Sequence, residues 1–383
     1  MALAYTPGLK RKEMYIVRKT RRLPIQGEVL VKEGDKVDHN TILATTQAPG
    51  RVETVNAAER LLLVPDPNTH SVELKKYMFK KEGDPVKKGE QIALKKELFG
   101  LFKRTITSPI DGKLEYISNM SGQIILREPP IKIDLDSYIP GTIVKILSKE
   151  GAIIECVGAF IQGIFGLGGE THGELMKAVN SPDEVLTAEH VSHECKGKIL
   201  IGGSLATEAA IRKAMEVGAK GIVVGGIEES VLTKILGFRV GVAITGHEDI
   251  PLTLIVTEGF SKMSISDKTF QLLTKSEGQL ACLNGATQIR AGVIRPEIII
   301  PRDDVPTSKA IDKGEEQLSK GMESGLPIRI IREPYFGALG HVVSLPIELQ
   351  IVETESKVRI LEAKLDDGRK VIVPRANVEL IEE

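Results

Sequence analysis

The sequence has few of the residues that mark secreted, membrane-spanning or disulfide-bonded proteins. It contains no tryptophan and only three cysteines, Cys156, Cys195 and Cys282, an odd number without C-x-x-C spacing. Cysteines scattered in this way favour neither disulfides nor an iron–sulfur cluster. No run of 18 apolar residues occurs, and the first seven residues are too short for a signal peptide. We therefore expect a cytoplasmic protein without membrane insertion.

Neither sign of charge dominates. The 383 residues carry 51 Lys and Arg against 52 Asp and Glu, a formal net charge of −1, so composition alone does not indicate nucleic-acid binding. Residues 1–138 are more basic, with 24 basic against 18 acidic residues. Seven of these bases form an N-terminal cluster: Lys10, Arg11, Lys12, Arg18, Lys19, Arg21 and Arg22. The cluster fits a solvated arm or a contact with an acidic partner or phosphate.

The first third of the chain repeats one pattern of turns and strands. Residues 32–55 contain an E-G-D-x-V turn, an apolar strand and an A-P-G turn, and residues 81–117 repeat this order with an S-P-x-D-G turn. In the second copy, the turn at 109–112 leads into a strand at 112–117 that is expected to pair with a strand at 122–126. A weaker third copy lies at 140–155.

The repeated pattern, G-D-x-V-x-x-G-x-x-[IL]-A, then a hairpin, then [AS]-P-x-[DS]-G-x-[IVL], resembles the biotinyl/lipoyl-type barrel-sandwich fold over about residues 22–133. The resemblance implies an all-β barrel-sandwich hybrid in residues 1–157, with a basic N-terminal arm and pseudo-twofold halves. In carriers of this family a modified lysine lies at the hairpin tip. Here the tip is 97–102, and Lys95, Lys96 and Lys103 are displaced from it. We therefore expect a non-carrier domain, without a lipoyl or biotinyl lysine or any other cofactor.

The hairpin tip instead carries four large apolar residues, Leu98, Phe99, Leu101 and Phe102. An apolar tip of this size is costly to leave in water. It is expected either to pack against the next domain of the chain or to bind a partner.

The middle of the chain, residues 158–302, alternates between strand and helix patterns. Apolar strands are predicted at 198–203, 221–226, 240–245 and 252–256, and helices at 205–217, 229–236 and 266–274, the first of them capped by Ser204. Strand–helix–strand units of this length imply parallel strands joined by right-handed crossovers. The pattern predicts a small Rossmann-like or swivelling α/β domain.

Glycines provide the candidate ligand site of this domain. Gly166, Gly168 and Gly169 lie in a glycine-rich segment whose backbone N–H groups could cradle an anion, and Gly202, Gly203 and Ser204 precede a predicted helix. The first loop is similar, through its glycines only, to the G-x-G-G-A-G-F-P-T loop of flavin-binding electron-transfer subunits. A G-x-G-x-x-G fingerprint and a P-loop lysine are both missing. The alternative is that these glycines only form a bent strand and turns.

No catalytic or metal-binding set stands out. The segments 257–260 and 284–288 follow predicted strands and contain a carboxylate and amides but no nucleophile beside a base. His190, His193 and Cys195, with His172 and Cys156 upstream, offer donors for Zn²⁺, but their spacing matches no common site. We expect no metal site, and the sequence leaves an enzymatic role uncertain.

The chain ends in a polar linker, 303–325, and a predicted small β-barrel, 326–383. Residues 326–345 resemble the KOW motif through an R-x-x-P-[YF]-x-G turn between apolar strands, and strands at 357–364 and 370–373 flank a D-D-G-R turn. KOW modules contact RNA or protein. Eight basic residues against ten acidic ones favour protein. The candidate contact residues are Arg329, Arg332, Tyr335, Phe336, Arg359, Arg369 and Arg375.

The sequence therefore predicts three domains in the order barrel-sandwich hybrid, α/β domain and SH3-like (KOW) barrel. The leading hypothesis is a non-enzymatic adaptor or scaffold in a cytoplasmic assembly linked to RNA, in transcription or translation. One alternative is an enzyme or electron-transfer subunit that binds a flavin, nucleotide or phosphorylated ligand at the glycine-rich loops. Another is direct RNA binding through the KOW module. Protein partners are expected first and RNA second, and the oligomeric state is left open.

Overall fold

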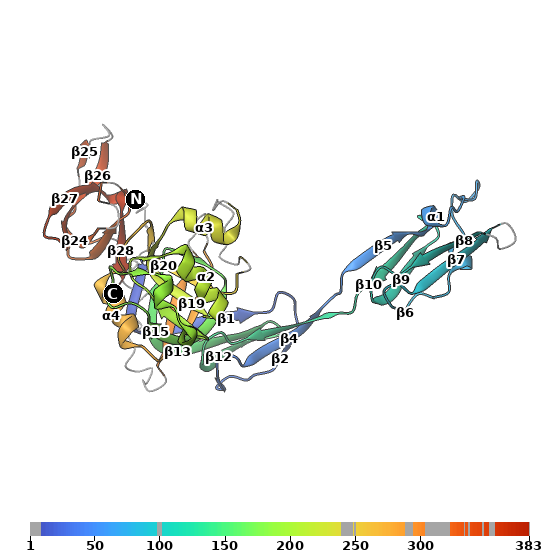
Figure 1. Cartoon of the computed structure of the whole chain (residues 1–383), viewed down its shortest axis with the longest axis horizontal. Coiled ribbons are helices and arrows are strands. Elements are labelled where there is room, and N and C mark those ends of the chain that lie inside the picture. Colours follow the sequence, from blue (N-terminus) through green and yellow to red (C-terminus); the bar gives the residue numbers. More distant parts are fainter. Residues whose placement is uncertain are drawn as a thin grey trace.

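The computed structural model describes residues 9–97, 102–238, 248, 250–287, 294–302, 322–332, 334–335, 338–346, 348–351 and 357–382. The fold is mostly β, with 49% strand against 14% helix and four α-helices in this described part of the chain. The molecule is elongated: an α/β body carries a small β module on one side, and a stalk of extended strands holds a second β module far from the body (Figure 1). No helix among the described residues is long and apolar enough to cross a membrane.

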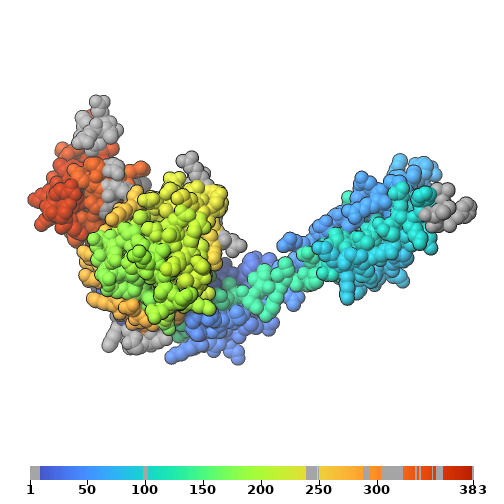
Figure 2. Space-filling view, in the orientation of Figure 1, coloured from blue at the N-terminus to red at the C-terminus, as the bar shows by residue number. Residues whose placement is uncertain are grey.

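The distal module, residues 52–127, forms the far end of the molecule (Figure 2). One antiparallel sheet has the strand order β5-β10-β9-β6, and β7 pairs with β8 in a hairpin. Its elements are β5 (Val52–Asn56), α1 (Ala57–Arg60), η1 (Leu74–Tyr77), β6 (Pro85–Val86), β7 (Gln91–Glu97), β8 (Phe102–Thr107), β9 (Gly112–Ser118) and β10 (Gln123–Arg127). Buried residues of these strands, such as Leu114 and Ile117 of β9, fill a core that belongs to this module alone. The β9–β10 pairing confirms the predicted hairpin.

A second set of strands builds the stalk and one side of the body. Strand β13 pairs with both β1 and β12, β12 also pairs with β3, and β4 lies between β11 and β2. The strands are β1 (Leu9–Arg22), β2 (Glu28–Val29), β3 (Lys36–Val37), β4 (Ile42–Ala48), β11 (Ile131–Asp136), β12 (Gly141–Leu147) and β13 (Gly151–Gln162). Their core includes Leu43, Ile143 and Ile154, together with Cys282 and Ile299 from the α/β part.

These strands and the distal module are two copies of one motif. Strand β12 corresponds to β9, β13 to β10, and the β4–β11 pair to the β7–β8 hairpin. The same hydrogen bonds recur at matched positions. The Ile146 amide donates to Glu33 Oε1, as the Ile117 amide does to Glu82 Oε1, both at 3.0 Å. The Gly34 amide donates to Ile143 O at 2.8 Å, as the Gly83 amide does to Leu114 O at 2.7 Å. The Lys32 amide donates to Asp35 Oδ2 at 2.8 Å, as the Lys81 amide does to Asp84 Oδ2 at 2.7 Å.

The second copy is nested inside the first. The chain leaves β4 at Ala48, builds the whole distal module, and returns at Ile131, which pairs directly with Ala48. The weaker third repeat at 140–155 is therefore the second half of the first copy. This corrects the sequence analysis, which treated 32–55 and 81–126 as two halves of a single fold. The structure places residues 32–48 in the core shared by the stalk and the body, and residues 52–55 together with 81–126 in the core of the distal module.

The α/β part of the body contains four neighbouring parallel strands, β15, β17, β19 and β20. Strand β14 pairs antiparallel with β20, and β21 and β22 connect β15 to β13. The elements are β14 (Phe165–Leu167), β15 (Glu170–Lys177), β16 (Val185–Leu186), η3 (Ala188–His190), η4 (His193–Cys195), β17 (Lys198–Ile201), β18 (Leu205–Ala206), α2 (Glu208–Val217), β19 (Gly221–Ile227), α3 (Glu229–Leu236), β20 (Thr253–Phe260), α4 (Asp267–Lys275), β21 (Leu280–Asn284) and β22 (Glu297–Pro301). All seven residues of β19 are buried, because strands or helices cover both of its faces.

Most predicted elements of this part are confirmed. Helices α3 and α4 and strands β17, β19 and β20 lie where the sequence places them, within a few residues. The start of α2 differs: Ser204 and the next two residues continue as an extended segment, and Thr207 caps the helix by accepting from the Ala210 amide. The predicted strand at 240–245 lies outside the described residues.

The C-terminal module follows the linker and forms its own small core. Its strands pair in the order β27-β26-β24-β23-β28, with β25 added to β26. They are β23 (Pro327–Ile330), β24 (Leu339–Ser344), β25 (Leu349–Ile351), β26 (Lys357–Leu365), β27 (Lys370–Pro374) and β28 (Val378–Glu382), with η6 at Arg375–Asn377. The predicted turn at 366–369 joins β26 to β27. The end of β28 also pairs with the start of β1, which fixes this module to the body.

Candidate binding sites

The distal module presents apolar side chains on the outer face of its sheet. Tyr116 of β9 is 51% exposed, and Ile125 of β10 lies beside it in register, next to Thr54 of β5. Val52, two residues before Thr54 and on the same face, is also exposed. The Arg127–Glu115 ion pair, with Nε and Oε2 2.8 Å apart, lies at the same end of the sheet. A cluster of exposed apolar groups beside polar ones is typical of a binding surface.

The hairpin of the distal module is a second exposed element. Within the described part of the chain, β8 pairs only with β7, so its other edge is open to a further strand. Phe102, the first residue of β8, is 61% exposed. The other predicted tip residues, Leu98, Phe99 and Leu101, lie outside the described residues.

Gly166, Gly168 and Gly169 are packed against other backbone segments. A Cβ on Gly168 would lie 2.2 Å from Leu252 O, and one on Gly166 would lie 2.6 Å from Gly285 O. The Gly166 amide donates to Thr287 Oγ1 at 2.9 Å. Gly168 and Gly169 have positive φ angles of 88° and 66° in the turn between β14 and β15. Close packing and turn geometry therefore account for these glycines, and the Gly166 amide is already used within the fold.

Gly202, Gly203 and Ser204 do not begin a helix, which corrects their predicted role. A Cβ on Gly203 would lie 2.2 Å from Glu184 O. The Ser204 amide donates to the same oxygen at 2.8 Å, and the Ser204 hydroxyl donates to Asp183 O at 2.6 Å. The segment is held against residues 181–184, and its amides are not directed from a helix N-terminus toward a ligand.

The histidines and cysteines of the α/β part serve local structure. His190 lies 3.1 Å from Glu184 through Nε2 and 3.0 Å from the Thr187 hydroxyl through Nδ1. Cys195 is fully buried, and all three cysteines are free thiols. Among the described residues, no three His, Cys, Asp or Glu side chains are grouped as metal ligands.

The candidate contact residues of the C-terminal module are in three different environments. Arg332, Arg359 and Arg369 are exposed, and Arg369 pairs with Asp367 at 2.6 Å and lies over the Tyr335 ring, 5.6 Å from its centroid. Arg375 of η6 donates to the carbonyls of Ile360 in β26 and of Pro346 in the segment after β24. Phe336 lies outside the described residues.

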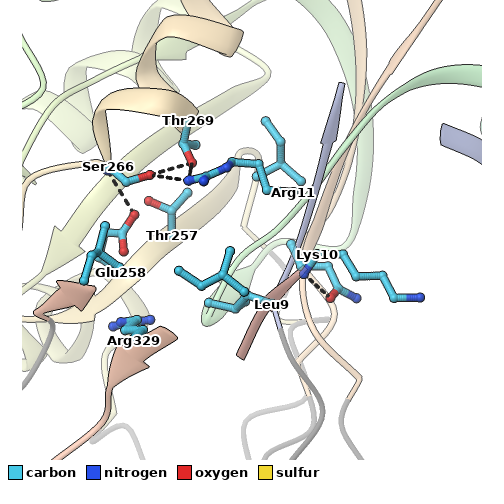
Figure 3. Close-up of a pocket in the computed structure, with 12 residues that line it drawn as sticks. Leu9, Lys10, Arg11, Thr257, Glu258, Ser266, Thr269 and Arg329 are labelled. Atoms are coloured by element: carbon cyan, nitrogen blue, oxygen red, sulfur yellow. Dashed lines mark hydrogen bonds between the residues drawn. The ribbon is translucent and has the colours of Figure 1, made fainter. Parts of the chain in front are cut away.

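Arg329 is buried, which corrects its prediction as an exposed contact residue. Its residue exposure is 2%, and its side chain points from β23 toward the body (Figure 3). Burial lowers the pKa of Arg329, while Glu258 and Glu379 raise it and Arg295 lowers it further. Glu379 in turn forms an ion pair with Arg295, and burial raises the pKa of Glu379 against the effect of these two arginines.

A cavity of about 30 Å³ lies beside Arg329, where the body and the C-terminal module meet. Thr257 and Glu258 of β20 and Ser266 and Thr269 at the start of α4 form one wall, and Leu9 and Arg11 of β1 form another (Figure 3). Only one wall could be expected from the sequence, because Thr257 and Glu258 fall near the end of a predicted strand. Nothing in the sequence brings β1 and β23 to the same place.

A contact between two histidines was not expected from the sequence. His39, in the turn before β4, packs on His172 of β15 with ring centroids 4.1 Å apart. His39 Nδ1 lies 2.6 Å from the Asp38 carboxylate, and a hydrogen bond from the His39 amide lowers the pKa of Asp38. The pair connects the base of the stalk to the α/β part.

Comparison of the chain with known proteins adds no family assignment. No model of a protein family matches the sequence, and no curated protein matches it either.

Proposed function

We propose that this chain is a non-enzymatic adaptor of a cytoplasmic assembly and that its distal module binds a partner protein. The observation that carries the proposal is the position of this module: the stalk holds it away from the body, so that the body does not cover it (Figures 1 and 2). A module with its own core can keep its shape at that distance.

The outer face of the distal sheet is the proposed contact surface. Tyr116 and Val52 are exposed there, and Ile125 of β10 lies beside Tyr116 on the same face. Tyrosine is among the residues that contribute most to binding energy at protein interfaces, because its ring buries a large area and its hydroxyl can still form a hydrogen bond. The resemblance to non-carrier barrel-sandwich domains supports the same role, since such domains also occur as adaptors and inserted modules in larger assemblies.

The other functions considered from the sequence receive less support. Backbone packing explains the glycines that were candidates for a flavin, nucleotide or phosphorylated ligand. Direct RNA binding through the KOW-like module is less supported, because two of its candidate contact residues are used within the fold. Arg329 is buried, and Arg375 donates to two backbone carbonyls. A link to an assembly that handles RNA, through a protein contact, stays a prediction from the KOW resemblance.

The test compares three full-length proteins: the wild type, Tyr116→Glu and Ile372→Glu. Ile372 is a matched control, because it is 59% exposed on β27 of the C-terminal module and receives the same charge. The partner is first identified by cross-linking to the wild type in nuclease-treated extract of its own source, and its affinity for each purified protein is then measured by titration.

We expect Tyr116→Glu to weaken partner binding by about tenfold or more and Ile372→Glu to leave it near the wild-type value. Equal affinity of Tyr116→Glu and the wild type would contradict a contact through this face. If nuclease abolishes partner binding, the contact depends on RNA. If only Ile372→Glu abolishes it, the contact lies on the C-terminal module.

A further inference from the structure

The cavity between the body and the C-terminal module is built from three separate parts of the chain. Strand β1 comes from the N-terminal motif, β20 and α4 from the α/β part, and β23 from the C-terminal module. A volume of about 30 Å³ admits about two water molecules, or the oxygen atoms of one small oxyanion.

Arg329 supplies two hydrogen-bond donors without partners. Its Nε and Nη1 atoms are buried and have no hydrogen-bond partner among the residues that the structure describes. Leaving a buried charged donor unpaired costs on the order of several kcal/mol. Glu258 and Glu379 lower this cost by attraction across space, but the donors themselves remain open. A group with negatively charged oxygens in the cavity would satisfy them.

The opposite wall adds further groups that stabilise an anion. The Arg11 guanidinium is held by the Ser266 hydroxyl at 3.0 Å, and the Ser266 hydroxyl donates to Thr269 Oγ1 at 2.8 Å (Figure 3). Thr269 lies in the first turn of α4, a helix of nine residues, and Ser266 is its N-cap. The side chain of Ser266 forms no capping hydrogen bond, and the N-terminal end of a helix favours negative charge.

Two arginines and one carboxylate have charged groups at the cavity wall. Arg11 and Arg329 line it against Glu258, whose Oε1 accepts from the Ser266 amide at 3.1 Å. Behind Arg329, Arg295 and Glu379 form an ion pair and compensate each other. Lys10 also lines the cavity, but its side chain points away (Figure 3).

We propose that this cavity binds one small oxyanion, a carboxylate or phosphate group, with Arg329 as the main charge partner and the first turn of α4 as the second. This site is independent of the distal module and goes beyond the proposed adaptor function. Because its walls belong to three parts of the chain, a bound oxyanion also fastens the C-terminal module to the body.

The experiment measures anion binding by full-length protein. Wild type is titrated with potassium phosphate and, separately, with sodium acetate, each against potassium chloride of equal ionic strength, and the melting temperature is recorded. The phosphorus NMR line width of phosphate gives a second readout. Arg329→Met removes the donors at nearly the same volume, and Arg359→Met is the matched control on the exposed surface of the same module.

We expect a saturable rise in melting temperature of the wild type and of Arg359→Met with at least one of the two anions. In Arg329→Met the response is expected to be at least tenfold weaker. A response to phosphate alone assigns a phosphoryl group, and a response to acetate alone assigns a carboxylate. The proposal is overturned if the wild type responds to neither anion more than to chloride, or if Arg329→Met responds like the wild type.

If Arg329→Met does not fold, a second variant tests anion binding at the same cavity. Thr269→Val keeps the shape of the side chain and removes the hydroxyl that faces the cavity. It is expected to weaken anion binding several-fold, and an unchanged affinity would also overturn the proposal.

Discussion

His172, which packs on the ring of His39, has a pKa that depends on the folded structure. Burial lowers the pKa of His172, and the nearby His39 and Lys220 charges lower it further, whereas Asp136 and Asp38 act in the opposite direction. A histidine whose folded pKa lies below its unfolded value of 6.5 favours the folded state only while it is neutral. Its contribution to stability is present above pH 6.5 and is lost as the pH falls through the folded pKa.

We predict that the free energy of unfolding falls more steeply on acidification in the wild type than in His172→Gln. Urea unfolding followed between about pH 7.5 and about pH 5 measures both slopes. His341→Gln is the control, since His341 is an exposed histidine of the C-terminal module. Equal slopes in the wild type and His172→Gln would show that this pair does not titrate against folding.

The burial of Arg329 and the N-cap of α2 could not be predicted from the sequence. Arg329 follows a strand pattern in a KOW-like segment, where exposed arginines are common, and its burial depends on β1 and α4, more than 50 residues away in sequence. Thr207 and Ser204 are both good helix caps, and only the packing of Gly203 on Glu184 decides between them. A local sequence pattern cannot show which of two conformations forms when contacts with residues far away in the sequence determine the outcome.

At the scale of elements, matched turns of the two motifs invite a direct comparison. Gly34 and Gly83 hold the same place in the two E-G-D turns, with φ angles of 91° and 97°, and an added Cβ at either would meet no atom within 4 Å. Alanine at these positions therefore costs backbone strain and no steric clash.

We predict that Gly34→Ala and Gly83→Ala each lower the free energy of unfolding of their own motif by about 1 kcal/mol. Thermal unfolding monitored by hydrogen exchange resolves which motif is affected. Each variant serves as the control for the other, because the change is the same and only the motif differs. A loss confined to one of the two turns would show that the copies are not equivalent in energy.

The predicted elements were largely confirmed because they depend on local periodicity. Helix α3 begins and ends where the sequence places it, and the β9–β10 and β26–β27 hairpins follow from their turn residues. The nesting of one motif in the other could not be predicted in this way. Strand β4 pairs with β11 across more than 80 residues, and the nearer A-P-G turn at 48–50 suggested a local partner instead.

At the scale of the whole molecule, two separate cores imply two separate unfolding units. Leu114 and Ile143 are matched positions of the two motifs, and both are almost completely buried. Since the stalk connects the distal module to the body without a shared core, loss of packing in one should not reach the other.

We predict that Leu114→Ala lowers the stability of the distal module by about 2 to 5 kcal/mol and leaves the body unchanged, while Ile143→Ala does the reverse. Differential scanning calorimetry measures both transitions in the same sample. A single transition that moves equally in both variants would mean that the molecule unfolds as one unit.

The pairing of Ala48 with Ile131 means that the distal module enters and leaves the body through neighbouring positions of one antiparallel ladder. Residues 49–130 can therefore be excised and the gap closed with an Asn-Gly turn, which leaves an ordinary β-hairpin. The shortened protein is expected to show the calorimetric transition of the intact body and no affinity for the partner that we propose to contact Tyr116. Evolution or protein engineering could therefore replace the module at this hairpin. The body would keep its architecture, and a different inserted module would give it a different partner.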